Sequence, residues 1–400
     1  MIKEIVLKDF FSFRNETHIK LKKGANILLG INGSGKTTFL NSLSLLHYGL
    51  SGRFEELFQK RWGGYQNVVN YGEDSLPQSI ELTYVFDNEA LAPFYQMRNY
   101  SDDVYYKIII TPVGDQSYSI EETVFVYRGD TDMTNVFAHV KNGIGEFGVE
   151  QEDGNIHMER YSLRLSDMEL SLSQVKDPGK YFLLNAIQGA VSTISLYDTF
   201  DTSAGSEIRK PAPYSKLERI SPSGDNLVQW LSNAKNNDLS LYKRVLEYLN
   251  KVNPHFEEFN FKELGELTYM YLQESGLNRA IGMKHLSEGT IRFLLLTAIL
   301  LNKKRGSIVG IDEPEGGLHP DMLFSISELI HHASETSQLM IATHSPLLLN
   351  AFDLDDIIVF EKDATNSSIV KYYDEDDFPE MEGALPGQLW INGLIGGKRW

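Results

Sequence analysis

The segment GINGSGKT, residues 30–37, constrains the fold more than any other stretch of the chain. It matches the phosphate-binding pattern G-x-x-x-x-G-K-[ST] and lies between an apolar strand-like segment and a helical pattern, which is the context that this loop requires. Gly30, Gly33 and Gly35 let backbone N–H groups converge where a Cβ would obstruct phosphate oxygens. The segment therefore predicts a nucleotide-binding α/β fold.

The side chains of this loop predict how a nucleotide is held. Lys36 can bridge the β- and γ-phosphates, and the Thr37 hydroxyl can bind Mg²⁺. The dipole of the following helix adds to the attraction for phosphate. The predicted nucleotide-binding residues of the loop are Gly30, Asn32, Gly33, Ser34, Gly35, Lys36, Thr37 and Thr38.

Two later strand-like segments end in side chains suited to hydrolysis. SIVGID (307–312) brings Asp312 and Glu313 to the carboxyl edge of the predicted sheet, and QLMIAT (338–343) brings His344 there. We expect Asp312 to hold Mg²⁺, directly or through water, and Glu313 to polarise the attacking water. His344 is expected to sense the γ-phosphate.

A second helix start has the character of an anion site. In KHLSEGTIRFLLLTAILL (284–301), Ser287 can cap the helix and Gly289 allows close approach. The helix spans about 24 Å. Unless the chain folds back sharply, its start should lie about a helix length from the phosphates bound by the loop at 30–37. We therefore expect Ser287 and Gly289 to contact a phosphate held by a second copy, related by a two-fold axis.

The order of patterns along the chain predicts an α/β core that is split by an insertion. Residues 1–50 plus 286–400 should form the P-loop core. Residues 51–175 form a β-rich insert, whose alternating apolar pattern and turn breaks indicate an antiparallel meander. Residues 176–285 form a helical lobe that leads to the second helix start.

Composition limits the partners and the location. The net charge of −18 disfavours binding of nucleic acid over the whole surface, although it does not exclude a local basic groove. The absence of cysteine excludes disulfides and thiolate metal sites and fits a reducing cytoplasm. No run of 18 apolar residues and no signal-peptide pattern occurs, so we expect a cytoplasmic protein without a membrane partner.

Four motifs, taken in order, carry a resemblance to a known family. GINGSGKTT, LSEGT, GIDEPEGGLHP and ATHSP resemble the Walker A, signature, Walker B with D-loop, and H-loop of ABC-type ATPases. More narrowly, they resemble the SMC/RecF/OLD-like branch and the stand-alone ATPases of bacterial genome-defence and repair systems. The resemblance extends over nearly the whole chain and implies an ABC ATPase head.

This resemblance implies ATP and Mg²⁺ as cofactors and a homodimer, or a higher homo-oligomer, with two ATPs between subunits. Each ATP would be capped by Ser287, Glu288 and Gly289 of the second copy, although Glu288 and Thr290 replace a Gly and a Gln of the family's LSGGQ signature. The family's Q-loop glutamine, a Mg²⁺ ligand, is assigned to Gln66.

The resemblance also gives three functional hypotheses. The first is an ATP-driven switch in anti-phage defence that controls a separately encoded effector, a nuclease, since the sequence shows neither long heptad runs nor a fused nuclease domain. The second is a RecF-like repair ATPase that acts directly on DNA. The third is a transporter nucleotide-binding subunit, which LSEGT and the β-rich insert disfavour.

Overall fold

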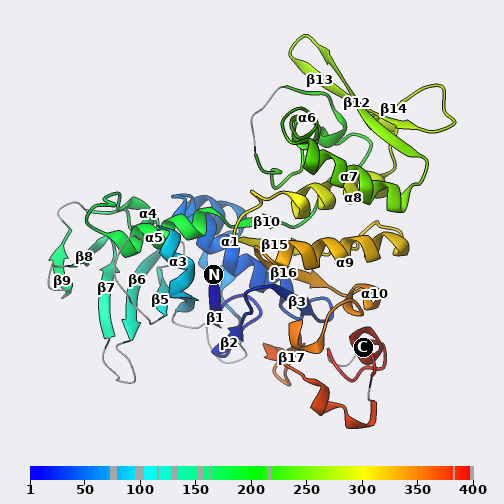
Figure 1. The fold of residues 1–400 in the computed structure, drawn as a ribbon. Coiled ribbons are helices and arrows are strands. Elements are labelled where there is room, and N and C mark those ends of the chain that lie inside the picture. Colours follow the sequence, from blue (N-terminus) through cyan, green and yellow to red (C-terminus); the bar gives the residue numbers. More distant parts are fainter. Residues whose placement is uncertain are drawn as a thin grey trace.

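The computed structural model describes residues 1–72, 79–94, 103–114, 117–127, 134–150, 156–161, 164–213, 218–381 and 383–396. These residues form a mostly parallel sheet covered by helices, a larger antiparallel sheet beside it, and a lobe with a small sheet (Figure 1). Within these ranges, no helix combines the length and the apolar character needed to cross a membrane.

The mostly parallel sheet confirms the predicted α/β core. Its strand order is β10 (Ser195–Tyr197), β15 (Ile308–Asp312), β16 (Gln338–Thr343), β3 (Ala25–Leu29), β17 (Ile357–Lys362) and β18 (Ser368–Lys371). Neighbouring strands run parallel except for β17 and β18. Every residue of β3 and β16 is buried, as expected for strands covered on both faces.

Helices cover both faces of this sheet. Alternate residues of β3 enter different cores, because successive side chains of a strand point to opposite faces. Leu28 packs with Phe39 of α1 (Lys36–Leu50), whereas Ile27 and Leu29 pack in the core that includes α8 (Glu288–Leu301) and α9 (Pro320–Ser334). The remaining helices are α2 (Tyr65–Val68), α3 (Asn88–Leu91), α4 (Ser171–Gln174), α5 (Phe182–Ser192), α6 (Leu227–Asn237), α7 (Leu239–Val252), α10 (Pro346–Leu349) and α11 (Pro386–Ile391).

The antiparallel sheet confirms the predicted meander and adds two strands to it. Its order is β2 (Thr17–Lys20), β1 (Ile2–Lys8), β4 (Ile80–Phe86), β5 (Val104–Val113), β6 (Ser117–Tyr127), β7 (Thr134–Lys141), β8 (Ile144–Glu150) and β9 (Ile156–Arg160). β1 and β2 precede the P-loop in the chain but pair here, with Ile5 opposite Tyr84 of β4. The sheet thus crosses the boundary that the sequence placed at residue 50.

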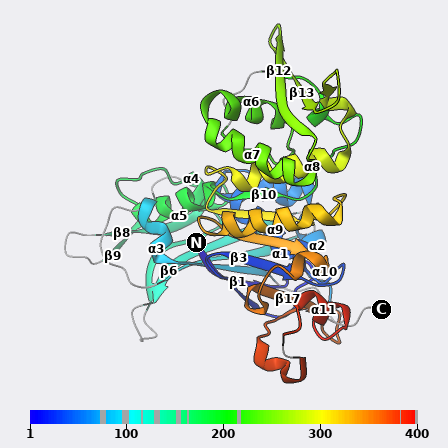
Figure 2. The same ribbon diagram turned by 45° about the vertical axis from the view of Figure 1, so that its right-hand side comes forward.

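The lobe between α5 and α8 contains strands as well as helices. Figures 1 and 2 show α6 and α7 with a long hairpin above α8. The hairpin joins β12 (Phe256–Leu264) to β13 (Leu267–Glu274), and β11 (Ala212–Pro213) and β14 (Ile281–Gly282) pair with β13. The lobe that was predicted to be helical thus contains this hairpin in addition to α6 and α7.

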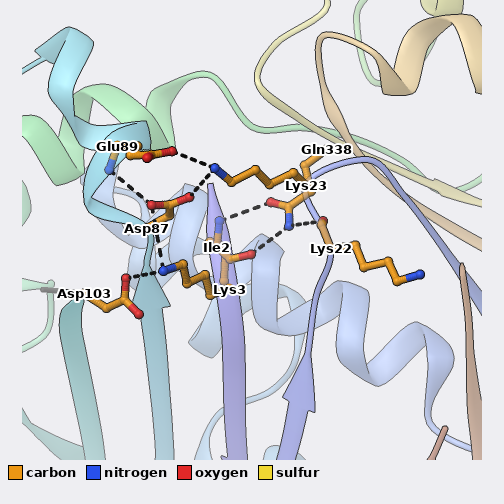
Figure 3. A network of polar contacts seen from close by, with 8 residues as sticks. All are labelled: Ile2, Lys3, Lys22, Lys23, Asp87, Glu89, Asp103 and Gln338. Carbon is orange, nitrogen blue, oxygen red and sulfur yellow. Dashed lines mark hydrogen bonds and ion pairs between the residues drawn. The ribbon is translucent and has the colours of Figure 1, made fainter. Parts of the chain in front are cut away.

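Gln338, at the start of β16, joins the two large sheets (Figure 3). Its amide oxygen accepts a hydrogen bond from the backbone N–H of Ile2 at 3.1 Å. Its amide nitrogen donates to the carbonyl oxygens of Ile2 at 2.7 Å and Lys22 at 2.8 Å. Gln338 is fully buried, so these bonds satisfy a side chain that water cannot reach.

Ion pairs lie beside this junction (Figure 3). They are Lys3–Asp103 at 2.6 Å, Lys23–Asp87 at 3.1 Å and Lys23–Glu89 at 2.8 Å.

Candidate nucleotide-binding site

A cavity of about 740 Å³ lies at the carboxyl ends of β3 and β15. Its walls bring together the predicted loop residues and Glu313, which follows β15. The lining also includes residues 69–72 and the segment that follows β17. The predicted site residues that line this cavity are Asn32, Gly33, Gly35, Lys36, Thr37, Thr38 and Glu313.

The loop backbone has the shape that its glycines predict. Gly33 and Gly35 have φ angles of 78° and 117°, in the region that favours glycine. A Cβ on Gly30 would lie 2.4 Å from the carbonyl oxygen of Phe360, and one on Gly35 would lie 2.7 Å from Ser368 Oγ. Among the described residues, the buried Ser34 hydroxyl has no hydrogen-bond partner. An open, polar loop of this kind fits a bound phosphate chain.

The Lys36 ammonium lies against the loop itself. It donates hydrogen bonds to the carbonyl oxygens of Gly30 at 2.7 Å and Ile31 at 3.2 Å. Burial lowers the pKa of Lys36, and the negative charge of Asp312 opposes this shift. A buried ammonium whose hydrogen bonds go to neutral carbonyl oxygens gains from an anion placed beside it, so the site fits a nucleotide phosphate.

Thr37 and Asp312, the two residues predicted to hold Mg²⁺, contact each other directly. The Thr37 hydroxyl donates a 3.0 Å hydrogen bond to Asp312 Oδ2. Burial raises the pKa of Asp312, and the bond from Thr37 opposes that effect. A hydroxyl and a carboxylate oxygen are the hard ligands that Mg²⁺ prefers when nucleotide phosphates and water complete its shell. The two residues therefore fit the ion.

Glu313 and His344 face one another at the edge of the sheet. His344 Nδ1 lies 3.3 Å from Glu313 Oε1, and each side chain is nearly half exposed. Glu313 has a φ of 49°, which is uncommon for a residue with a Cβ. Its N–H donates to the carbonyl oxygen of Ala342 at 2.8 Å, so the end of β16 fixes its position. The carboxylate and the imidazole together can accept and pass a proton at this edge.

Glu315 belongs to the same cluster, and the sequence reasoning missed it. Its Oε1 accepts hydrogen bonds from Thr343 Oγ1 at 2.7 Å and from the His344 N–H at 3.0 Å. The signal available in the sequence was a third acid in IDEPE, two positions after Glu313. Nothing in that spacing shows that its carboxylate holds the end of the neighbouring strand.

The start of α8 is capped as predicted, and the first turns of this helix lie against the loop that follows β15. Ser287 Oγ accepts a hydrogen bond from the Thr290 N–H at 3.0 Å. The chain folds back after α8. A 2.9 Å hydrogen bond from Arg292 to the carbonyl oxygen of Glu313 shows this, because it joins the first half of α8 to the end of the following strand. A helix length therefore does not separate α8 from this edge.

Ser287, Glu288 and Gly289 nevertheless lie outside the described lining of the P-loop cavity. Ser287 and Glu288 are exposed at the start of the helix. Their contact with a nucleotide held by a second copy stays a prediction.

Gln66 also stays a prediction. It lies on α2 with an exposed side chain. The described lining of the cavity includes its neighbour Asn67 and residues 69–72, but not Gln66. The segment is thus at the site, while the Mg²⁺ role of this particular glutamine is not tested.

Two family models match this chain. Residues 4–175 match an AAA domain family, and residues 197–350 match the family described as "AAA domain, putative AbiEii toxin, Type IV TA system". The DNA replication and repair protein RecF of Nitrosococcus oceani is 44% identical over 62 residues, which are 15% of this chain. The match spans only 17% of that protein's length.

Solved structures show the same fold. A crystal structure of an SMC head bound to the C-winged helix domain of ScpA has a TM-score of 0.57 at 16% identity, covering 94% of this chain and 99% of that one. The Smc head domain with an extended coiled coil, bound to the C-terminal domain of ScpA derived from Pyrococcus furiosus, has a TM-score of 0.54 at 15% identity, covering 94% and 97%. The two AAA family matches and the RecF segment support the similarity to SMC/RecF-like ABC-type ATPases that the four motifs carry, and the solved structures show that the chain has the fold of an SMC head.

Proposed function

We propose that this chain binds and hydrolyses Mg-ATP and works as a conformational switch that closes as a homodimer around two ATPs. The observation that carries the proposal is the pairing of Thr37 with Asp312 at 3.0 Å beside the pairing of Glu313 with His344 at 3.3 Å. A metal-binding pair and an acid–base pair at one end of a phosphate loop are what phosphoryl transfer to water needs.

Each residue has a role that its position supports. When bound, Mg-ATP supplies the phosphoanhydride bond and a divalent charge that screens the phosphate oxygens. Lys36 would bind the β- and γ-phosphates, and Thr37 with Asp312 would hold Mg²⁺. Glu313 would take a proton from the attacking water, and His344 would orient that carboxylate and contact the γ-phosphate.

Closure of the dimer is supported by the start of α8. Ser287 and Glu288 are exposed there, at the positive end of a helix of 14 residues. In a two-fold dimer each copy presents the same surface, so each α8 can meet the nucleotide of the other copy. A γ-phosphate contacted from both copies gives the differential binding that a two-state switch requires.

We propose that the switch acts in the bacterial cytoplasm and controls a separately encoded effector, a nuclease, in defence against phage. The resemblance to defence ATPases supports this role. The family matched by residues 197–350 is itself described by a toxin and a type IV toxin–antitoxin system, which fits control of a toxic partner.

Direct action on DNA is the second candidate, and one observation favours it. The 62-residue match at 44% identity is to a replication and repair protein. The net charge of −18 counts against extended contact with a phosphate backbone. ATP-dependent DNA binding with a steep dependence on salt would support this candidate.

The hydrolysis and dimer steps are tested with two variants. We expect Glu313→Gln to bind ATP, to lose hydrolysis, and to accumulate as a dimer in light scattering with Mg-ATP. Ser287→Arg should bind ATP as a monomer but fail to dimerise, because a bulky cation replaces the small cap at the exposed start of α8. Hydrolysis by Glu313→Gln at the normal rate would contradict the assignment.

The effector is tested by native mass spectrometry of the tagged chain purified from its own host, with and without Mg-ATP. A second protein in fixed stoichiometry, encoded beside this chain and released or bound according to nucleotide, supports the switch. A dimer that carries DNA and no second protein supports the RecF-like candidate instead.

A further inference from the structure

Arg292 connects α8 to the backbone of Glu313. Its Nη2 donates a 2.9 Å hydrogen bond to the Glu313 carbonyl oxygen. Among the described residues, its Nε is buried and has no hydrogen-bond partner. The guanidinium thus donates a strong, charge-assisted hydrogen bond to the backbone of the residue that we expect to activate water.

Glu313 needs such support, because it adopts a left-handed backbone conformation with a φ of 49°. For a residue with a Cβ this conformation is strained. The peptide groups on both sides of it are held: its N–H by the carbonyl of Ala342, and its carbonyl by Arg292. Release of either bond would let the backbone relax and turn the carboxylate away from His344.

Glu315 holds the other half of the pair. Its Oε1 accepts from Thr343 Oγ1 and from the His344 N–H, and its side chain is 10% exposed. Among the described residues, its Oε2 is buried without a partner. Burial lowers the pKa of Arg292, and the charge of Glu315 is the largest influence that opposes it. Two opposite charges therefore lie in one network, each fixing a different strand end.

The same loop touches the start of α8. A Cβ on Gly289 would lie 2.9 Å from the carbonyl oxygen of Gly317. The first turns of α8 therefore contact the loop 313–317 at two places, through Gly289 and through Arg292. A displacement of this helix start would therefore act on the loop that carries the Glu313 carbonyl.

We infer that Arg292 and Glu315 are positioning residues that set Glu313 and His344 relative to the start of α8, so that each copy couples its contact with the other copy's nucleotide to its own hydrolytic carboxylate. The inference rests on the proposed function, in which Ser287 and Gly289 meet a nucleotide of a second copy. It goes beyond that function because it couples the nucleotide occupancy of one site in the dimer to hydrolysis at the other, through the Arg292 side chain.

The test compares Arg292→Ala and Glu315→Gln with Arg305→Ala. Arg305 is a matched control: its burial also lowers its pKa, its Nε is also without a partner among the described residues, and it donates to backbone carbonyls away from this site, those of Leu300, Asn302 and Ala333. ATP affinity, kcat, KM and the Hill coefficient for ATP are measured on the full chain, with each rate normalised to the folded fraction.

We expect Arg292→Ala and Glu315→Gln to lower kcat at least about tenfold, the value of one charge-assisted hydrogen bond, while ATP affinity changes less than about twofold. The Hill coefficient should fall to one. Arg292→Lys, which keeps the charge and a donor, should recover part of kcat. Arg305→Ala should lower stability but leave kcat and KM of the folded fraction unchanged.

The outcomes separate this inference from the proposed function. If Glu313→Gln abolishes hydrolysis but Arg292→Ala and Glu315→Gln keep the normal kcat and Hill coefficient, the inference is wrong and the proposed function stands. If Glu313→Gln keeps hydrolysis, the proposed function fails and the inference fails with it. Equal losses in Arg292→Ala and Arg305→Ala would reduce Arg292 to a structural role and overturn the inference.

Discussion

The Thr37 hydroxyl donates a hydrogen bond of 3.0 Å to Asp312 Oδ2, across 275 positions of the chain. Thr37 stands at the start of α1, and Asp312 is the last residue of β15. The bond shows that the phosphate loop and the acidic strand end reach a common point. It also holds the two oxygen atoms close together, which in the proposed function would reduce the ordering cost of binding Mg²⁺.

Asp312→Asn should abolish Mg²⁺-dependent ATP binding, because the neutral amide is a poor ligand for this ion. Thr37→Ser, which keeps the hydroxyl, should retain it. Binding of a fluorescent ATP analogue with Mg²⁺ and with EDTA measures both variants. Equal Mg²⁺ dependence in Asp312→Asn and the unaltered chain would show that the ion is held elsewhere.

Asp312→Asn should also raise the free energy of unfolding of the nucleotide-free protein at neutral pH. Burial raises the pKa of Asp312 above its usual 3.8, so the folded chain keeps this proton over a pH range in which the unfolded chain has lost it. The free energy of unfolding therefore falls as pH rises from 3.8 through that range, and ionised Asp312 destabilises the nucleotide-free fold at neutral pH. Urea unfolding at pH 7 should show Asp312→Asn to be the more stable, with a gap that narrows towards acid pH. A gap independent of pH would exclude this cause.

Lys36→Met should lower ATP affinity at least about tenfold, because it removes the buried ammonium that we propose binds the β- and γ-phosphates. The fold should persist, since the carbonyl oxygens that Lys36 contacts belong to the open loop. Lys141→Met is the control, since Lys141 forms an exposed ion pair with Glu121 in the antiparallel sheet. Isothermal titration calorimetry measures both. Similar affinities in the two variants would remove Lys36 from the site.

Gly289→Ala should impair hydrolysis although alanine is the better helix former. The new Cβ would lie 2.9 Å from the carbonyl oxygen of Gly317, so one backbone or the other must move. Gly205→Ala is the control, because open space surrounds its Cβ position. Steady-state ATPase assays compare the two variants. A loss of rate in both, or in neither, would show that the contact has no role.

Gln338→Leu should destabilise the fold by about 3 kcal/mol, because it removes the buried hydrogen bonds that Gln338 makes to the N–H and C=O of Ile2. Lys23→Ala, which removes only the exposed ion pairs of the same region, should cost less than about 1 kcal/mol. Urea unfolding measures both. A small effect of Gln338→Leu would mean that other contacts join the two sheets.

The sequence was sufficient for the parts of the site that depend on local pattern. The loop at 30–37 and the strand ends at Asp312 and His344 each follow a buried apolar run, and such runs are visible without a structure. The hairpin of β12 and β13 was missed for a physical reason. β12 buries Phe256 and Phe259, three residues apart, and its pairing register shifts just after Phe256, so its apolar spacing imitates a helix.

The network behind Glu313 could not be predicted, because it depends on contacts between segments that meet only in the folded chain. Arg292 lies in the apolar helical run at 284–301, and no pattern in it shows that its guanidinium reaches a carbonyl 21 positions later. Glu315 contacts His344 across 29 positions. The fold-back after α8, which the sequence left open, cannot be derived from helix length alone, because it depends on the return path of the strand that follows.

The position of β3 has a consequence for how this protein is made. β3 ends at Leu29, yet it is hydrogen-bonded on one side to β16 and on the other to β17, and both are synthesised more than 300 residues later. A nascent chain therefore carries its phosphate loop on a strand without neighbours until nearly the whole polypeptide has left the ribosome. Contacts so distant in sequence form slowly, and an apolar strand that waits this long is prone to aggregate. Production of the protein should thus depend on chaperones, and a truncated chain released before β16 should not acquire nucleotide binding.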